Sequence, residues 1–129
     1  MRVRPADGKR AIFLLIALGV AAFAPPASAH AVLVKSSPAS RSVLSYSPAA
    51  VDLWFNERLE AAFSSVSVWN AAGAQVDRRD AAVSPDDGKR LSVSLGALAA
   101  GTYTVRFRVL SVDGHVVEAS FPFTVKPAP

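Results

Sequence analysis

The segment at residues 101–110, GTYTVRFRVL, constrains the fold more than any other part of the chain. Large apolar side chains occupy every second position from Tyr103 to Val109, and threonine or arginine fills the positions between them. A period of two places successive side chains on opposite faces of a β-strand. The segment therefore predicts a strand with one buried face and one solvated face.

Shorter runs of the same kind recur after residue 30, separated by segments rich in Gly, Pro, Asn and Asp that favour turns. We predict strands at residues 31–35, 50–55, 64–69, 91–95, 101–110 and 120–126, with a weaker one at 74–78. No run after the first 29 residues has helical periodicity. About seven short strands predict an all-β fold, a small antiparallel Greek-key sandwich or barrel. We expect its core to contain the aromatic residues in or directly beside these runs, namely Trp54, Phe55, Phe63, Trp69, Tyr103, Phe107, Phe121 and Phe123.

Residues 1–29 have the pattern of a secretory signal peptide. Basic residues precede an apolar run of 14 residues, Ala11–Ala24, and Ala27 and Ala29 supply the small side chains expected before a cleavage point. A membrane-spanning helix needs about 20 apolar residues, so the run is too short to be an anchor. We expect residues 1–29 to be removed and residues 30–129 to form one exported domain, in the periplasm or outside the cell and not inserted in a membrane.

The composition of the predicted mature domain limits its partners and its metal chemistry. Four of the 14 Lys and Arg residues and one of the 10 Asp and Glu residues lie in the leader, so the remaining charges nearly balance. Nucleic acid is therefore not an expected partner. The chain has no cysteine, and Met1 is its one methionine. The soft sulfur ligands that Cu(I) prefers are thus missing from the domain.

The chain has two histidines, and both stand at positions suited to metal binding. Cleavage after Ala29 gives His30 a free α-amine beside its imidazole, and with a pKa of about 7.7 the amine can lose its proton to a metal near neutral pH. Asp113 and His115 are two residues apart, so in an extended segment their side chains point to the same side. Three nitrogens and one oxygen form a tetragonal set that favours Cu(II). A turn-capping Asp beside a solvated His, and cleavage that falls before His30 by chance, are the alternative interpretations.

Three segments resemble the CopC family of periplasmic copper-binding proteins. They are HAVLVKSSPA at residues 30–39, VDLWFNERLEAAFSSVSV at 51–68 and ALAAGTYTVRFRVLSVDGHVVEASFPFTVK at 97–126. The resemblance implies a cupredoxin- or immunoglobulin-like Greek-key fold. It also implies one Cu(II) per chain bound by His30, Asp113 and His115, with Glu57 near the metal as a weak ligand or a hydrogen-bonding partner.

The function implied by this resemblance is copper buffering, resistance or delivery by an exported monomer that is not an enzyme. Some relatives carry a methionine-rich Cu(I) loop and a further histidine where this chain has Trp54, so the chain is similar to the Cu(II)-only kind. A separate CopD-like membrane copper transporter is the implied partner. Two other functions remain open: a copper redox enzyme built on a histidine brace, and a metal-free β-sandwich used for adhesion or assembly.

Overall fold

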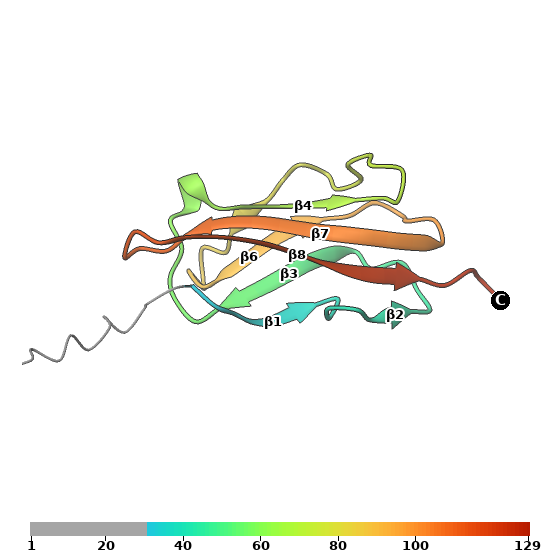
Figure 1. The fold of residues 1–129 in the computed structure, drawn as a ribbon, viewed down its shortest axis with the longest axis horizontal. Coiled ribbons are helices and arrows are strands. Elements are labelled where there is room, and N and C mark those ends of the chain that lie inside the picture. Colours follow the sequence, from blue (N-terminus) through green and yellow to red (C-terminus); the bar gives the residue numbers. More distant parts are fainter. Residues whose placement is uncertain (1–30) are drawn as a thin grey trace, which may run out of the picture.

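The fold was analysed in a computed structural model, which describes residues 31–129. The predicted leader and His30 lie outside the described residues. Eight strands and one short 3-10 turn, η1, follow one another along residues 31–129 (Figure 1). Their bounds are β1 Leu33–Ser37, β2 Val43–Leu44, β3 Ala50–Phe55, η1 Ala61–Phe63, β4 Ser65–Trp69, β5 Ala82–Val83, β6 Arg90–Ser94, β7 Gly101–Leu110 and β8 Val116–Val125.

The strands form two four-stranded sheets that pack face to face as a sandwich (Figure 1). One sheet has the order β1-β3-β6-β5 and the other β2-β8-β7-β4. The longest pairing joins β7 to β8 in unbroken register from Gly101↔Val125 to Leu110↔Val116. The predicted all-β sandwich is confirmed, with one correction to its antiparallel pairing: the two residues of β2 run parallel to β8.

Alternation along the strands accounts for the core between the sheets. The four apolar side chains at every second position of β7 are all buried, as the period of two predicted. Val51 and Leu53 of β3 and Leu91 and Val93 of β6 face them from the other sheet and are equally buried. Burial of one such side chain contributes about 1.5–3 kcal/mol. A chain without cysteine depends on this packing, since it forms no disulfide.

Some strand boundaries differ from the sequence prediction. The differences occur where polar side chains interrupt the pairing or where a strand is very short. Residues 74–78 form no strand but two isolated bridges, Trp69↔Gln75 and Asp77↔Leu95. The buried Asp77 explains this, because its carboxylate accepts the Val68 backbone N–H at 2.8 Å and the Arg79 N–H at 2.8 Å. β8 begins at Val116, four residues before the predicted strand. Strands β2 and β5, with two residues each, are too short to show any periodicity.

Three of the eight aromatic residues predicted to lie in the core do not lie there. Phe63, in η1, is 66% exposed. Trp54 and Trp69 are half-buried and stack against cations, with the Arg106 guanidinium 5.1 Å from the Trp69 ring centre. Because successive side chains of a strand point to opposite faces, Trp54 and Phe55 cannot both face the core, and Phe55 does.

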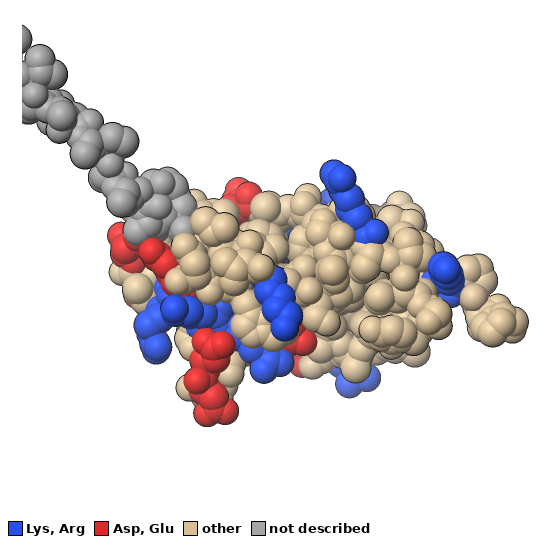
Figure 2. Space-filling view, turned by 90° about the horizontal axis from the view of Figure 1, so that it is seen from below, with Lys and Arg blue, Asp and Glu red and all other residues tan. Residues whose placement is uncertain are grey.

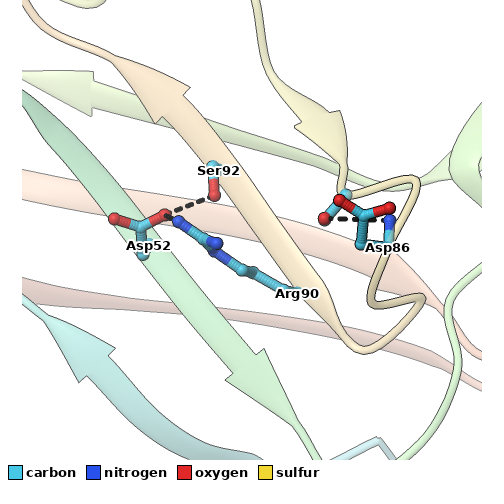
Figure 3. Close-up of polar contacts among 5 residues, drawn as sticks. Asp52, Asp86, Arg90 and Ser92 are labelled. Carbon is cyan, nitrogen blue, oxygen red and sulfur yellow. Dashed lines mark hydrogen bonds and ion pairs between the residues drawn. The ribbon is translucent and has the colours of Figure 1, made fainter.

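The outer face of the β1-β3-β6-β5 sheet is held by polar contacts around Asp52. Its Oδ1 accepts hydrogen bonds from Arg90 at 2.6 Å and from the Ser92 hydroxyl at 2.5 Å (Figure 3). Arg90 and Lys35 also lie over the Trp54 ring, at 5.4 and 4.7 Å from its centre. The charged side chains of Asp52, Arg90 and Lys35 therefore contact residues of neighbouring strands, and such cross-strand pairs stabilise a sheet.

No helix in residues 31–129 has the length and apolar character needed to cross a membrane.

Candidate metal centre

The loop between β7 and β8 carries two of the predicted ligands. Its backbone is closed by two hydrogen bonds, from the Ser111 N–H to the His115 carbonyl at 3.0 Å and from the Gly114 N–H to the Ser111 carbonyl at 2.9 Å. Gly114 has φ +94°, a left-handed conformation that glycine adopts without a steric penalty. The turn therefore fixes the start of β8, and with it His115, relative to Asp113.

Asp113 and His115 contact each other within this loop. The imidazole Nδ1 of His115 lies 3.2 Å from Oδ1 of Asp113, and the two side chains are 47% and 30% exposed, respectively. The structure brings the two side chains together through a turn at Gly114 rather than through the extended segment that the spacing indicated. The pair is accessible to an ion from solvent, and it combines a carboxylate oxygen with an imidazole nitrogen.

The buried Ser111 forms hydrogen bonds with both members of the pair. The Ser111 hydroxyl donates a hydrogen bond to Oδ1 of Asp113 and accepts one from the His115 backbone N–H at 3.3 Å. Chiefly through this hydroxyl, and secondarily through His115, the pKa of the Asp113 carboxyl is held below its ordinary value of 3.8. Asp113 is therefore a carboxylate at neutral pH, and a carboxylate can bind a cation without first losing a proton.

A second segment, residues 56–60, lies beside the loop. The Val112 N–H donates to the Arg58 carbonyl at 3.0 Å, and the Glu60 N–H donates to the Leu110 carbonyl at 2.8 Å. Leu59 and Ser111 form a bridge between the two segments. Glu57 belongs to this neighbouring segment, where its side chain is half-buried. The backbone of this segment thus lies beside the loop, but among the described residues the Glu57 side chain is not grouped with Asp113 and His115 closely enough to hold a metal ion.

The beginning of the described chain lies at the same end of the sandwich. The Val32 N–H donates to Oδ1 of Asn56 at 2.6 Å, and the Asn56 N–H donates back to the Val32 carbonyl at 3.0 Å. Ala31, which follows His30 in the sequence, is 2% exposed. Figure 1 shows the start of β1, the end of β3 and the β7–β8 hairpin together at the left end of the molecule.

Asn56 was not identified from the sequence. The signal for it would have been its place directly after a predicted strand, where a side-chain amide can accept a backbone N–H. Its two hydrogen bonds with Val32 tie the beginning of the chain to the segment that carries Glu57. Asn56 therefore connects the start of the described chain to residues 56–60, which in turn lie beside the loop.

Charged side chains near this end are mixed in sign. On the face seen in Figure 2, acidic and basic side chains alternate around the end where the chain leaves the described part. On this face, charges of one sign do not form a single extended patch at that end.

The described residues alone do not group enough donors for a metal site. Within residues 31–129, no three His, Cys, Asp or Glu side chains are grouped closely enough to hold a metal ion. Asp113 and His115 provide one oxygen and one nitrogen, whereas a tetragonal N,O site of the kind that suits Cu(II) needs four donors. A Cu(II) site built on this pair would need its other donors from outside residues 31–129 or from groups brought in by binding.

Comparison with known proteins gives a consistent family assignment. The CopC domain profile matches residues 33–126. The copper transport protein CutJ of Bacillus subtilis (strain 168) is 35% identical over 122 residues, which is 93% of this chain and 23% of CutJ. The chain thus spans less than a quarter of that relative. Copper resistance protein C of Xanthomonas campestris pv. juglandis is 36% identical over 106 residues, 78% of this chain and 83% of that protein.

Solved structures agree with this assignment. The crystal structure of CopC from Methylosinus trichosporium OB3b superposes with a TM-score of 0.69 at 37% identity, covering 78% of this chain and 97% of that chain. The profile match extends from β1 to the end of β8, so it includes both sheets and the loop that holds Asp113 and His115. The chain therefore belongs to the CopC family.

Proposed function

We propose that the protein binds one Cu(II) ion for copper buffering, resistance or delivery. The ligands are the α-amine and imidazole of His30, the carboxylate of Asp113 and the imidazole of His115. The observation that carries the proposal is the convergence at one end of the sandwich of the Asp113–His115 pair, 3.2 Å apart, and the chain immediately after His30, held by Asn56. The names of CutJ and of copper resistance protein C support copper as the cargo.

The donor set accounts for the proposed oxidation state. Oxygen and imidazole donors suit Cu(II), whereas Cu(I) prefers thiolate or thioether sulfur, and Met1 is the one sulfur-containing residue of the chain. Asp113 is already ionised, so the carboxylate releases no proton on binding, whereas the α-amine of His30 must lose its proton. Copper affinity should therefore fall as the pH is lowered, because protons compete with the metal for the amine.

The site requires residues 1–29 to be removed, because a peptide bond to Ala29 would convert the His30 amine into an amide. We propose that residues 1–29 are the signal peptide and that residues 30–129 act as a monomer in the periplasm or cell envelope. Glu57 is proposed as a weak ligand or as a hydrogen-bonding partner of the metal ligands. A separate CopD-like membrane copper transporter is the proposed partner for transfer.

Binding rather than catalysis is proposed because the carboxylate of Asp113 stabilises Cu(II) over Cu(I) and so opposes redox cycling. Copper-loaded protein treated with ascorbate should produce no more hydrogen peroxide than an equal amount of chelated copper. A large excess of peroxide would favour the histidine-brace enzyme instead.

The test of the proposed function uses two proteins of equal length. One begins at His30 and has a single glycine added after Pro129, and the other has that glycine placed ahead of His30. Titration with Cu(II), followed by electron paramagnetic resonance, should show tight one-to-one binding with nitrogen-rich tetragonal parameters for the first. The second should bind far more weakly. Equal affinity and equal spectra would refute the N-terminal chelate.

A further inference from the structure

We propose that Ser111 is a positioning residue of the copper site, whose hydroxyl holds the Asp113 carboxylate in its metal-binding orientation. This inference rests on the proposed function, because it assigns a role to a residue that supports a proposed ligand. Ser111 is 0% exposed, so its side chain cannot itself reach an ion in solution. Any effect that it has on the metal must pass through the residues that it contacts.

The hydrogen bonds of Ser111 point towards the loop. A hydroxyl has a single hydrogen to donate. Two acceptors lie near it: Oδ1 of Asp113, in the shorter contact, and the His115 carbonyl at 3.4 Å. Because an ionised acceptor makes the stronger bond, the hydrogen belongs to the carboxylate. The oxygen of the same hydroxyl accepts the His115 backbone N–H at 3.3 Å.

These hydrogen bonds distinguish the two carboxylate oxygens of Asp113. Oδ1 of Asp113 receives the Ser111 hydroxyl and also lies 3.2 Å from Nδ1 of His115. Two contacts on one oxygen restrict rotation of the carboxylate, so we assign ion binding to Oδ2. An imidazole that donates its Nδ1 hydrogen carries its lone pair on Nε2, which is the nitrogen that binds a metal in this tautomer.

The surrounding fold keeps the hydroxyl in place. The Ser111 residue is bridged to Leu59, and its N–H is bonded to the His115 carbonyl, so the backbone on both sides is fixed. A ligand whose outer oxygen or nitrogen is hydrogen-bonded in this manner loses less freedom when the metal binds. Ser111 thus lowers the free-energy cost of ordering Asp113 in the complex.

The experiment compares Ser111→Ala with Ser64→Ala in protein that begins at His30. Ser64 is a suitable control because it is buried at 7% exposure and its hydroxyl accepts the Leu110 N–H at 3.1 Å, one residue before Ser111. Removal of a hydrogen bond that supports a metal ligand typically weakens metal affinity about 10- to 100-fold. We expect this loss and altered copper hyperfine parameters in Ser111→Ala, and wild-type affinity and spectrum in Ser64→Ala.

A double substitution tests whether the effect passes through Asp113. Ser111→Ala should weaken copper binding much more in the wild-type background than in Asp113→Ala, where the oxygen that it positions is missing and only its bond to the His115 N–H is lost. Equal additional losses in both backgrounds would overturn the assignment. Ser111→Thr, which keeps the hydroxyl, should recover the wild-type spectrum.

Two outcomes separate this inference from the proposed function. If the wild-type protein that begins at His30 binds no copper, the proposed function itself fails. If it binds copper and Ser111→Ala binds it equally well, only the role of Ser111 is refuted. If Ser111→Ala does not fold, nuclear magnetic resonance of the wild-type apoprotein tests the proposal instead. We expect a slowly exchanging Ser111 hydroxyl proton that is coupled to the Asp113 carboxyl carbon. The absence of this coupling would refute the proposal.

Discussion

Replacement of Asn56 by alanine tests whether the anchored start of the chain contributes to copper binding. The substitution removes the acceptor of the Val32 N–H, a 2.6 Å hydrogen bond, and leaves the bond from the Asn56 N–H to the Val32 carbonyl in place. One hydrogen bond contributes about 0.5–1.5 kcal/mol net, and a solvent-exposed one such as this belongs to the lower half of that range. The free energy of unfolding should therefore fall by about 0.5–1 kcal/mol.

Copper affinity should fall by a similar free energy. If the anchor holds the residues after His30 where the ligands meet, copper must order that segment itself in the variant. A loss of about 1 kcal/mol corresponds to a roughly fivefold weaker affinity, since 1.4 kcal/mol is tenfold. Isothermal titration with Cu(II), in competition with a chelator, measures this difference, and urea unfolding of the copper-free proteins measures the change in stability.

Asn70→Ala is the matched control for this prediction. Oδ1 of Asn70 accepts the N–H groups of Ala72 and Ala74 at 3.0 and 2.9 Å, in a turn after β4 at the opposite end of the sandwich. It should lose at least as much stability as Asn56→Ala and keep wild-type copper affinity. The reasoning is refuted if Asn56→Ala is destabilised but binds copper as tightly as the wild type, or if Asn70→Ala weakens copper binding equally.

Two further predictions concern the loop and the contact between Asp80 and Ser94 of β6. Gly114→Ala places a side chain at φ +94°, so we expect about 1 kcal/mol of destabilisation in thermal unfolding. Copper titration should also show a weaker affinity, because His115 is displaced. Unchanged stability and affinity would mean that the turn accommodates the side chain without strain. The hydroxyl and backbone N–H of Ser94 hold the pKa of Asp80 below its ordinary value of 3.8, so its carboxylate stabilises the fold at neutral pH and loses this effect as the pH falls through the lowered pKa. Asp80→Asn should therefore be less stable than the wild type at pH 7, with the difference shrinking below pH 3.8, and a constant difference across this range in urea unfolding would contradict the assignment.

The sequence predicted a strand correctly where apolar and polar side chains alternate over many residues. All ten residues of β7 were predicted from their period of two, and the four alternate apolar positions are buried. Strands β2 and β5 could not be found because two residues contain no period. The exposed position of Phe63 in η1 could not be found either, because the 3-10 turn interrupts the strand pattern that suggested burial.

The sequence predicted which residues belong to the candidate site but not how they are arranged. Asp113 and His115 were identifiable from their spacing, but the contact between them depends on the positive φ of Gly114 and on the hydrogen bonds that close the loop. Ser111 and Asn56 were not identifiable from the sequence, because a serine at a strand end and an asparagine after a strand are ordinary turn residues. Their importance comes from the partners that only the folded chain supplies.

The two parts of the proposed site differ in how they depend on folding. Asp113 and His115 lie on a hairpin loop closed by backbone hydrogen bonds and supported by buried Ser111, so they are positioned as soon as the sandwich forms. The amine of His30 exists as a ligand only after the bond to Ala29 is cut, whatever the state of the fold. A folded precursor would thus offer a metal the oxygen and nitrogen of the loop without the N-terminal chelate, and two donors bind much more weakly than four. Under the proposed function, tight copper binding is therefore confined to processed protein, so the precursor does not compete for copper before export.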